Sequence, residues 1–519
     1  MTLIQLTLNE AFQNAFHKYN NRVAFNYNAS ATTYGELKEE SYKIANALLK
    51  LNVENGTRVA LLLPNTPEYV FCQMAIYQVG AVNVPLNDML READIEYILK
   101  DSESTVLIVD ESFFQIISNI QNKLPHLKEI IGVSFDSQVP ENFTDWFTFK
   151  NSGSTEQPKS TISPTELSQI VYTGGTTGYP KGVQHSHSSS MNALYSAIID
   201  LEITEKDKLI LNSPLPHAAG ISLQAALLRG AEVYIERKFN LEKLLSMIQE
   251  HRITYFLAVP TMLYRIIDFL KEHKYDISSL NTIVYGTAPI ANKRLKEALD
   301  VFGPIFIQTF GLTESPGIAT KLSKRDHLIN GDMQRLSSCG QDTIYTKVYI
   351  LDENNQPLPE NKKGEIAIAS PTTMVGYYKL PEETNKTIKN GLLYSGDIGY
   401  KDENGYVYIL DRKKDMIISG GMNIYSSEVE DVIIKHPSIK QVAVIGVPDP
   451  EWGEAVTAFV IASEDIERQN FINWCSDQLS RYKHPKSFHF LNNLPLTALG
   501  KVDKKKLRDP YWKQNERNI

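Results

Sequence analysis

Cysteine is scarce in this chain of 519 residues, and the scarcity restricts both its fold and its location. Cys72, Cys339 and Cys475 are too few and too widely spaced for a disulfide framework or a zinc site. The N-terminal stretch carries Asn9 and Glu10 where a signal peptide needs an unbroken apolar region. We therefore predict a cytoplasmic protein.

Long apolar runs and an excess of positive charge are missing as well. No stretch reaches the ~18 consecutive apolar residues of a membrane-spanning helix, so we predict no integral membrane segment. Lys and Arg number 53 against 61 Asp and Glu, and the basic residues form no stripe that would follow a phosphodiester backbone. This composition excludes nucleic acid as a partner, while peripheral membrane association and a homodimer stay open.

The apolar residues that are present follow an α/β pattern. Short apolar runs at 59–63 and 81–86 flank a helical pattern at 68–80, which predicts a βαβ unit. The same alternation returns in three further segments, 105–110, 241–260 and 281–290. We therefore predict an α/β fold with layered sheets and helices on their faces.

The second half of the chain has a different pattern. Short strand-like segments separated by turn residues predict a hairpin-rich lobe between 346 and 410. The charged stretch from Asp411 to Asp415 then interrupts the apolar pattern, and a helix followed by a strand is expected beyond it. We predict a large α/β domain at 1–410 and a small α+β domain at 411–519.

The segment YTGGTTGYPKG, from Tyr172 to Gly182, concentrates glycine, threonine and lysine. Glycines let backbone N–H groups approach phosphate oxygens, hydroxyls donate further hydrogen bonds, and Lys181 adds a positive charge. The spacing matches neither a Walker A loop nor a GxGxxG dinucleotide fingerprint. Taken alone, the segment is compatible with a polyphosphate site or with a flexible surface loop.

Five further segments follow it in order: PLPHAAG (214–220), QTFGLTES (308–315), YSGDIGY (394–400), DRKKDMIISGGMNIYSSEVE (411–430) and LTALGKVDKKKL (496–507). With these segments the chain resembles the adenylate-forming superfamily, which includes acyl-CoA synthetases, aryl-CoA ligases, luciferases and the adenylation domains of peptide synthetases. The glycine-rich loop and the DRKKDMIISGGMNIY segment are most similar to those of fatty-acyl-CoA synthetases.

The resemblance implies a ligase that uses ATP, Mg²⁺ and CoA in two half-reactions. A carboxylate attacks the α-phosphorus of ATP to give an acyl-adenylate and pyrophosphate, and the thiol of CoA then displaces AMP. Each like-charge pair at ~4 Å costs on the order of 4 kcal/mol at an effective dielectric near 20. The site therefore needs cations and fixed dipoles around the phosphates.

The resemblance also implies roles for individual residues. Lys501 would pair with the substrate carboxylate and the α-phosphate, and Glu314 would hold Mg²⁺ together with Thr173. The polyphosphate would be bound by the residues of the glycine-rich loop, namely Thr173, Gly174, Gly175, Thr176, Thr177, Gly178 and Lys181. A solvated lysine and an exposed loop carboxylate are the alternatives for Lys501 and Glu314.

The nucleoside would contact residues of three segments. Phe310 stands where the family more often has a tyrosine stacked on adenine, and Thr313 follows in the same segment. Asp397 would accept hydrogen bonds from both ribose hydroxyls, because a carboxylate offers two adjacent acceptors, and Arg412 would contact the ribose or the phosphates. The alternative for Asp397 is a turn cap.

The substrate would lie between two other segments. His217 would border its carboxylate, while Gly286, Thr287 and Ala288 would line the adenine and acyl pockets. Thr287 stands where glycine is common, which changes the shape of the acyl pocket. Residues 215–223 include no carboxylate that could pair with the ammonium of an amino acid, so we predict an apolar acid, a fatty acid of medium or long chain.

In the family the small domain rotates between the two half-reactions. The resemblance places the hinge at Lys414, and it places Gly420 and Gly421 beside the pantetheine arm of CoA, where missing side chains let the arm approach the backbone. An aryl-CoA ligase, an acyl-adenylate donor to a carrier protein and, from a different class, a non-catalytic nucleotide-binding regulator stay open. The presence of Lys501 and Asp397 argues against the regulator.

Overall fold

The computed structural model describes most of the chain, namely residues 5–173, 180–286, 288, 290–328, 334–462, 466–496 and 502–512. The chain forms two compact units, Met1–Val348 with Ile368–Leu393 and Tyr349–Ala367 with Tyr394–Ile519. The boundary predicted at Asp411 lies inside the second unit, so the division into 1–410 and 411–519 stays a prediction.

The first unit contains a sheet built around the βαβ segment that the sequence predicts. Strand β3 (Arg58–Leu62) pairs in parallel with β4 (Val82–Pro85) and β5 (Val106–Asp110), and α3 (Pro67–Gln78) connects β3 to β4. The sheet is extended by β6 (Glu129–Val133) and β7 (Thr144–Asp145) beyond β5, and by β8 (Leu167–Thr173), β9 (Lys181–Ser186) and β19 (Gly376–Tyr377) beyond β4. Strand β9 runs antiparallel to both of its neighbours, β8 and β19.

A second sheet of this unit joins the N-terminus to the middle of the chain. Its order is β16 (Gln341–Asp342), β15 (Ser315–Leu322), β14 (Phe306–Leu312), β13 (Thr282–Gly286), β12 (Tyr255–Ala258), β10 (Lys208–Leu211), β11 (Glu232–Ile235), β1 (Val23–Tyr27) and β2 (Ser30–Thr33). Pairing is parallel from β14 to β1, and β14 and β15 form an antiparallel hairpin. The carboxyl ends of β13 and β14 therefore lie side by side.

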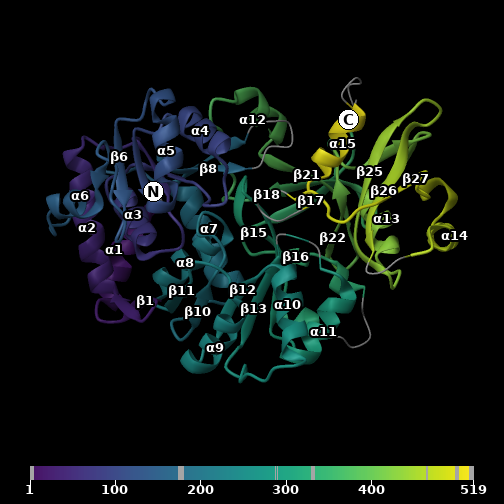
Figure 1. Ribbon diagram of the computed structural model, residues 1–519, viewed down its shortest axis with the longest axis horizontal. Coiled ribbons are helices and arrows are strands. Elements are labelled where there is room, and N and C mark those ends of the chain that lie inside the picture. The colour runs from purple at the N-terminus through teal and green to yellow at the C-terminus, as the bar shows by residue number, and fades with distance from the viewer. Residues whose placement is uncertain are drawn as a thin grey trace. The chain divides into compact units, whose positions relative to one another are not determined.

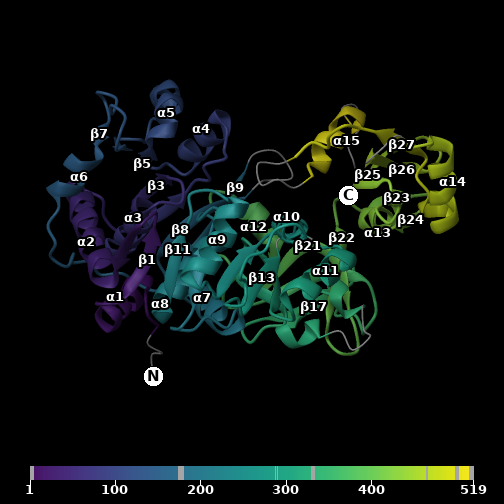
Figure 2. The same cartoon turned by 60° about the horizontal axis from the view of Figure 1, so that its bottom comes forward.

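The helices between the two sheets hold the core of the first unit. Helices α1 (Leu8–Tyr19), α2 (Tyr34–Lys50), α3, α7 (His187–Asp200) and α8 (Ala218–Arg229) share one hydrophobic cluster with strands of both sheets. Every residue of α3 from Tyr69 to Gln78 is buried, as expected for a helix covered on all sides. Figures 1 and 2 show α7 and α8 side by side in this layer.

The outer faces of the two sheets are covered by amphipathic helices. Helices α4 (Glu92–Asp101) and α5 (Phe114–Ile120) pack their apolar residues against the first sheet. Helices α9 (Leu241–His251), α10 (Pro260–Leu270) and α11 (Asn292–Phe302) each bury one side and expose the other. This arrangement is the layered α/β architecture that the sequence predicts.

The later part of the chain forms the predicted hairpin-rich lobe. One sheet has the order β17 (Lys347–Leu351), β18 (Gly364–Ala369), β21 (Leu392–Lys401) and β20 (Ile388–Lys389), and β22 (Val407–Arg412) also pairs with β21. A further sheet contains β23 (Ile417–Ser419), β24 (Met422–Ile424), β25 (Ile439–Asp449), β26 (Gly453–Ala462) and β27 (Ser487–Phe490).

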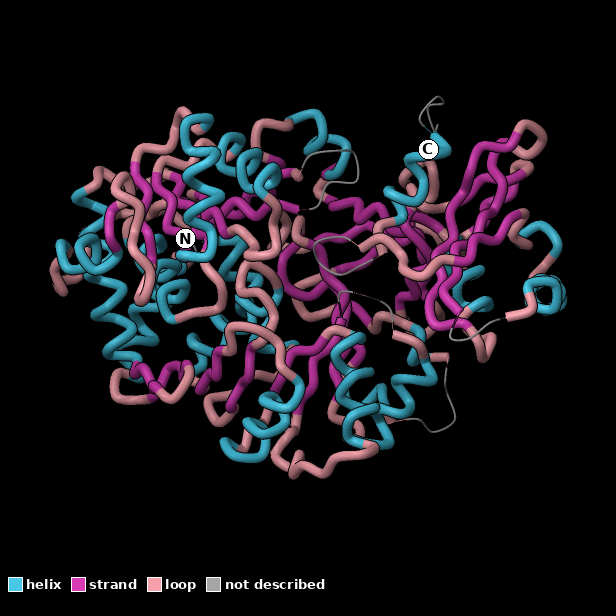
Figure 3. The backbone as a smooth tube through the Cα atoms, viewed as in Figure 1, coloured by secondary structure: helices cyan, strands magenta, loops and turns pink. Residues whose placement is uncertain are grey.

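The helix and strand expected beyond the charged stretch are present as α13 (Ser426–Ile433) and β25. Helices α14 (Arg468–Gln478) and α15 (Lys504–Trp512) complete the C-terminal part. The long β25–β26 hairpin is visible in Figure 3 as two adjacent magenta tubes. Within the described parts of the chain, we find no helix with the length and apolar character needed to cross a membrane.

Candidate active site

The glycine-rich segment connects two strands of the first sheet. Thr173 is the last residue of β8, Lys181 is the first residue of β9, and the two are directly paired across the antiparallel hairpin. The predicted phosphate-binding residues Gly174, Gly175, Thr176, Thr177 and Gly178 lie outside the described residues. The two ends of the loop are therefore adjacent on paired strands.

Lys181 is engaged by two residues that the sequence analysis missed. Its Nζ lies 2.6 Å from Oε2 of Glu383, on α12 (Pro381–Thr387), and 5.0 Å from the centre of the Tyr377 ring. Hydrogen bonds from Lys181 and Lys386 lower the pKa of Glu383 to about 2. This carboxylate therefore stays ionised and neutralises the lysine that we predict to contact phosphate.

Thr313 and Glu314 form the tight turn between β14 and β15, because Leu312 pairs directly with Ser315. The carbonyl oxygen of Glu314 accepts a hydrogen bond from the Met374 backbone N–H at 2.8 Å. Its carboxylate Oε1 accepts a hydrogen bond from the Tyr377 hydroxyl at 2.7 Å. The turn is thereby fixed against the segment that leads into β19.

The structure brings the predicted metal ligand Glu314 and the predicted phosphate ligand Lys181 to the same tyrosine, Tyr377. Among the described residues, Oε2 of Glu314 has no hydrogen-bond partner. A half-buried carboxylate with one oxygen available fits Mg²⁺, which prefers oxygen ligands and usually takes one or two carboxylates together with substrate phosphates.

The predicted adenine and acyl residues lie at the carboxyl ends of β13 and β14. Gly286 pairs with Thr309, and a Cβ at Gly286 would lie only 2.4 Å from the Thr309 carbonyl oxygen, so this position requires glycine. Phe310 follows on β14 and is partly buried. Ala288 is described two residues beyond Gly286, whereas Thr287 is outside the described residues. Carboxyl ends of parallel strands are the usual ligand-binding edge of open α/β sheets.

His217 immediately precedes α8, and its imidazole meets Asn87. The side-chain oxygen of Asn87 accepts the Met89 backbone N–H at 2.9 Å, which directs the amide nitrogen of Asn87 toward Nε2 of His217 at 2.8 Å. An amide nitrogen donates, so Nε2 of His217 is the acceptor in this hydrogen bond. The small residues Ala219, Ala225 and Ala226 pack into the shared core.

Asp397 and Arg412 are paired across the hairpin of β21 and β22 in the second unit. Nε of Arg412 lies 2.9 Å from Oδ1 of Asp397, whose residue is 3% exposed. The backbone N–H of Asp397 is bonded to the Ser395 hydroxyl at 3.0 Å. A buried carboxylate held by an arginine is a rigid acceptor, as the predicted contact with two ribose hydroxyls requires.

The predicted hinge and CoA-binding residues have a clear local structure. Burial lowers the pKa of Lys414, and its carbonyl oxygen accepts a hydrogen bond from Arg508 of α15 at 3.0 Å. Gly420 and Gly421, with φ of +57° and +77°, form the two-residue turn between β23 and β24. Positive φ at both positions is typical of a type I′ hairpin and explains both glycines.

Lys501 lies outside the described residues. Lys504, three positions later, is partly buried and lies 2.8 Å from Glu430 Oε1 and 2.7 Å from the Ser426 hydroxyl. The run of lysines in this segment is therefore not uniformly solvated, because one of its members joins α15 to α13.

The pair of Lys181 and Glu383 yields a testable expectation for nucleotide binding. If Lys181 contacts phosphate, it must leave Glu383, and a partly exposed ion pair is worth roughly 0.2–1 kcal/mol. Glu383→Gln should lower the KM for ATP by about 1.4- to fivefold. Glu382→Gln is the matched control. A higher KM in Glu383→Gln would mean that Glu383 orients Lys181 and does not compete with the phosphates.

Two family models match this chain. The model of the AMP-binding enzyme matches residues 12–378, and that of the AMP-binding enzyme C-terminal domain matches residues 428–501. The chain belongs to the AMP-binding enzyme family. The first match includes Lys181 and Glu314, and the second includes Lys501.

Individual relatives cover almost the whole chain. The medium/long-chain-fatty-acid–CoA ligase FadD8 of Mycobacterium tuberculosis (strain ATCC 25618 / H37Rv) is 33% identical over 511 residues, which cover 96% of this chain and 89% of that protein. A feruloyl-CoA synthase of an Amycolatopsis species is 32% identical over 490 residues, or 93% of this chain and 95% of that protein. Among solved structures, the o-succinylbenzoate CoA synthetase MenE from Bacillus subtilis, in complex with the acyl-adenylate intermediate OSB-AMP, matches with a TM-score of 0.86 at 27% identity, covering 99% of both chains.

Membership in the AMP-binding enzyme family confirms several predictions from the sequence. The fold is that of adenylate-forming enzymes, with a large α/β domain and a small C-terminal domain. The chain is an adenylate-forming acid–CoA ligase with ATP and CoA as co-substrates, and Mg²⁺ is typical of the family. The roles of individual residues stay predictions.

Proposed function

We propose that this ligase activates an apolar carboxylic acid, a fatty acid of medium or long chain, and transfers the acyl group to CoA. The observation that carries the proposal is the stretch of residues 215–223 around His217, which offers no carboxylate to a charged substrate tail. The likeness to FadD8, which is named as a medium/long-chain-fatty-acid ligase, supports the same class of acid.

In the first half-reaction, the protein must hold the triphosphate and offset its charge. We assign the phosphates to Lys181 and the glycine-rich loop, and the Mg²⁺ to Glu314 with the Thr173 hydroxyl. When bound, Mg²⁺ neutralises negative charge on the phosphate oxygens. Lys501 then supplies the positive charge that lets the substrate carboxylate approach the α-phosphorus.

Other residues orient the two reactants. Asp397, held by Arg412, accepts hydrogen bonds from the ribose hydroxyls, and Phe310 stacks on the adenine. His217 borders the substrate carboxylate. Gly286, Thr287 and Ala288 line the adenine and acyl pockets.

In the second half-reaction, the thiol of CoA attacks the acyl-adenylate. We propose a hinge at Lys414 and passage of the pantetheine arm beside Gly420 and Gly421. Both glycines are exposed, and Gly421 has open space where a Cβ would be. The absence of a side chain there leaves room for a ligand at the tip of the hairpin.

The test is acid-dependent release of pyrophosphate across fatty acids of graded length and several aryl acids, with and without CoA. A buried CH₂ group contributes about 0.8 kcal/mol, so kcat/KM should rise about fourfold per methylene until the acyl pocket is filled. AMP and acyl-CoA should appear together. The length at which the increase stops identifies the chain length of the substrate.

An aryl-CoA ligase is the second candidate, and the likeness to a feruloyl-CoA synthase favours it. Higher kcat/KM for aryl acids than for every alkyl acid would establish it and contradict our proposal. Acyl-adenylate that accumulates without thioester would indicate a carrier protein as the acceptor.

A further inference from the structure

Tyr377 links two groups that the proposed function assigns to the phosphates and the metal ion. It lies on β19, where it pairs with Val183 of β9, two residues from Lys181. Its hydroxyl is 2.7 Å from Glu314 Oε1, and its ring centre is 5.0 Å from Lys181 Nζ. One side chain therefore contacts the carboxylate through its hydroxyl and the ammonium group through its ring.

The hydroxyl of Tyr377 donates its hydrogen bond to Glu314, because a phenol O–H is a donor and a carboxylate oxygen is an acceptor. Such a bond fixes one carboxylate oxygen in direction without neutralising its charge.

We propose that Tyr377 is a positioning residue for metal binding: its hydroxyl fixes Oε1 of Glu314 so that Oε2 remains available to Mg²⁺. The proposal rests on the proposed role of Glu314 as metal ligand. Hydrogen-bonded partners of metal ligands set the orientation of the ligand, and their loss typically weakens metal binding or activity 10–100-fold.

The backbone around Tyr377 is held firmly enough for this role. Its own N–H donates to the Thr384 hydroxyl at 2.9 Å, and the N–H of Tyr378 donates to the Gly182 carbonyl oxygen at 2.7 Å. These two bonds attach the segment to α12 on one side and to β9 on the other. The ring of Tyr377 is thus placed by contacts that do not involve Glu314.

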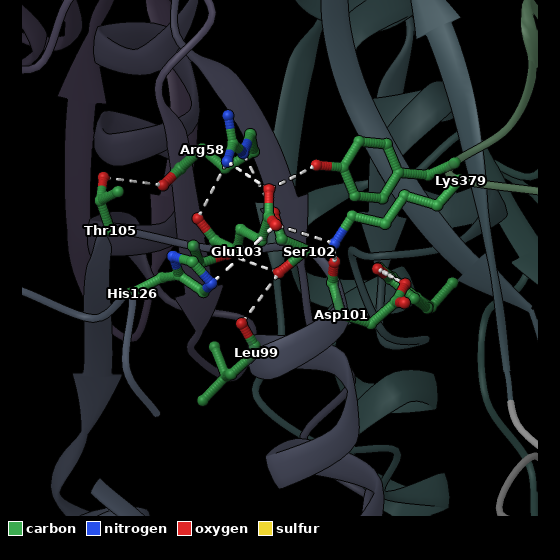
Figure 4. Close-up of polar contacts among 11 residues, drawn as sticks. Arg58, Leu99, Asp101, Ser102, Glu103, Thr105, His126 and Lys379 are labelled. Atoms are coloured by element: carbon green, nitrogen blue, oxygen red, sulfur yellow. Dashed lines mark hydrogen bonds and ion pairs between the residues drawn. The ribbon is translucent and has the colours of Figure 1, made fainter. Parts of the chain in front are cut away.

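The residues that follow Tyr377 are anchored to Glu103, in the turn between α4 and β5. Oε2 of Glu103 accepts the Tyr378 hydroxyl at 3.0 Å and an N–H of Arg58 at 3.1 Å, while Oε1 lies 3.0 Å from Lys379 Nζ. Figure 4 shows Arg58 and Lys379 on either side of this carboxylate. Tyr378 therefore provides a matched control, because it is the adjacent tyrosine and its hydroxyl also donates to a glutamate.

The test compares Tyr377→Phe with Tyr378→Phe. Mn²⁺ binding in the presence of α,β-methylene ATP, followed by electron paramagnetic resonance, reports on the metal site without turnover. Tyr377→Phe keeps the ring beside Lys181 and should weaken Mn²⁺ binding about tenfold or more, whereas Tyr378→Phe should bind it as the unmodified protein does. In the assay of pyrophosphate release, Tyr377→Phe should need more Mg²⁺, with the KM for the acid unchanged.

A double-mutant cycle with Glu314→Gln separates positioning from a general structural effect. If Tyr377 acts through Glu314, Tyr377→Phe should add little to the loss caused by Glu314→Gln. Equal Mn²⁺ affinity in the unmodified protein and Tyr377→Phe, or equal losses in both tyrosine variants, would overturn the proposal. The binding assay contains no acid, so an error in the proposed substrate would not change its result.

Discussion

Lys501→Ala should abolish acyl-adenylate formation while largely preserving thioester formation from a supplied acyl-adenylate. In the first step two anions meet, and removal of one preorganised charge-stabilising group typically costs about 10²–10³-fold in rate. In the second step a neutral thiol or its thiolate attacks a mixed anhydride, and the charge at Lys501 is no longer between two anions. The measurement is single-turnover adenylation beside CoA-dependent consumption of the purified adenylate. Lys505→Ala, at an exposed lysine of the same segment, is the control.

Gly421→Val should have the opposite effect, slowing attack by CoA and sparing adenylation. At a φ of +77° a valine is strained, so the variant needs a control with the same backbone geometry. Gly391 provides one, because its φ is +76° and it also has open space at the Cβ position. Gly391→Val should leave both half-reactions intact. If Lys501→Ala and Gly421→Val each reduced both half-reactions equally, this would contradict the proposal that Lys501 acts in adenylation and Gly421 in the attack by CoA.

The parallel core of the first unit could be predicted from the sequence because its strands are buried on both faces. Strands β3, β4 and β5 consequently consist almost entirely of apolar residues, and the helical pattern between β3 and β4 contains a helix of nearly the expected length. The pairing of β1 with β11 could not be predicted in this way. It joins segments about two hundred residues apart, and no short-range pattern in the sequence predicts such a pairing.

In the candidate site, residues within contiguous motifs could likewise be predicted from the sequence, whereas residues brought together by the fold could not. Thr173, Lys181 and Glu314 belong to contiguous motifs, and the resemblance locates them by number. Tyr377 and Glu383 contact them through the pairing of β19 with β9, and a Gly-Tyr-Tyr followed by Pro-Glu-Glu carries no chemical signature of its own. The roles of the Tyr377 phenol and the Glu383 carboxylate can be proposed only after the fold shows which residues they contact.

A sequence pattern does not show whether a glycine is needed by the backbone or by a ligand. Gly420 and Gly421 are explained by the turn between β23 and β24, and Gly286 by its close approach to Thr309. Gly220 likewise fits against the Leu215 carbonyl oxygen, where a Cβ would lie 2.1 Å away. A ligand-binding role for such positions is compatible with these constraints, but it requires functional evidence of the kind that Gly421→Val supplies.

Three buried histidines should make the protein sensitive to mild acid. His185, His187 and His327 are 0%, 0% and 1% exposed, and burial lowers the pKa of each to about 4 from the usual 6.5. This lowering of the pKa is opposed by neighbours that favour the charged ring, but their effect is smaller than that of burial. These neighbours are the Thr313 backbone beside His185, Glu166 and Glu10 near His187, and Ser323 with Asp326 near His327.

The sign of the effect follows from where protons bind. Below pH 6.5 the unfolded chain protonates these rings, whereas the native protein does so only near pH 4, so the free energy of unfolding falls as the pH decreases through this window. One pKa unit corresponds to about 1.4 kcal/mol, so each histidine should cost about 1.4 kcal/mol at pH 5.5 and about 3 kcal/mol at pH 4. Above pH 6.5 the contribution is constant.

Urea unfolding at pH 7.5, 5.5 and 4.5 checks this expectation. Carboxyls such as the partly buried Glu68 and the buried Asp411 have a pKa that desolvation raises, so they act in the opposite direction. The informative quantity is therefore the difference between variants. His185→Gln should lower stability at every pH but lose less of it between pH 7.5 and 5.5, by about 1.4 kcal/mol. His17→Gln, at an exposed position of α1, is the matched control. His185 is completely buried, and within the described parts of the chain neither of its ring nitrogens has a side-chain partner. An unchanged slope in His185→Gln would contradict the expectation that its protonation is penalised in the native protein.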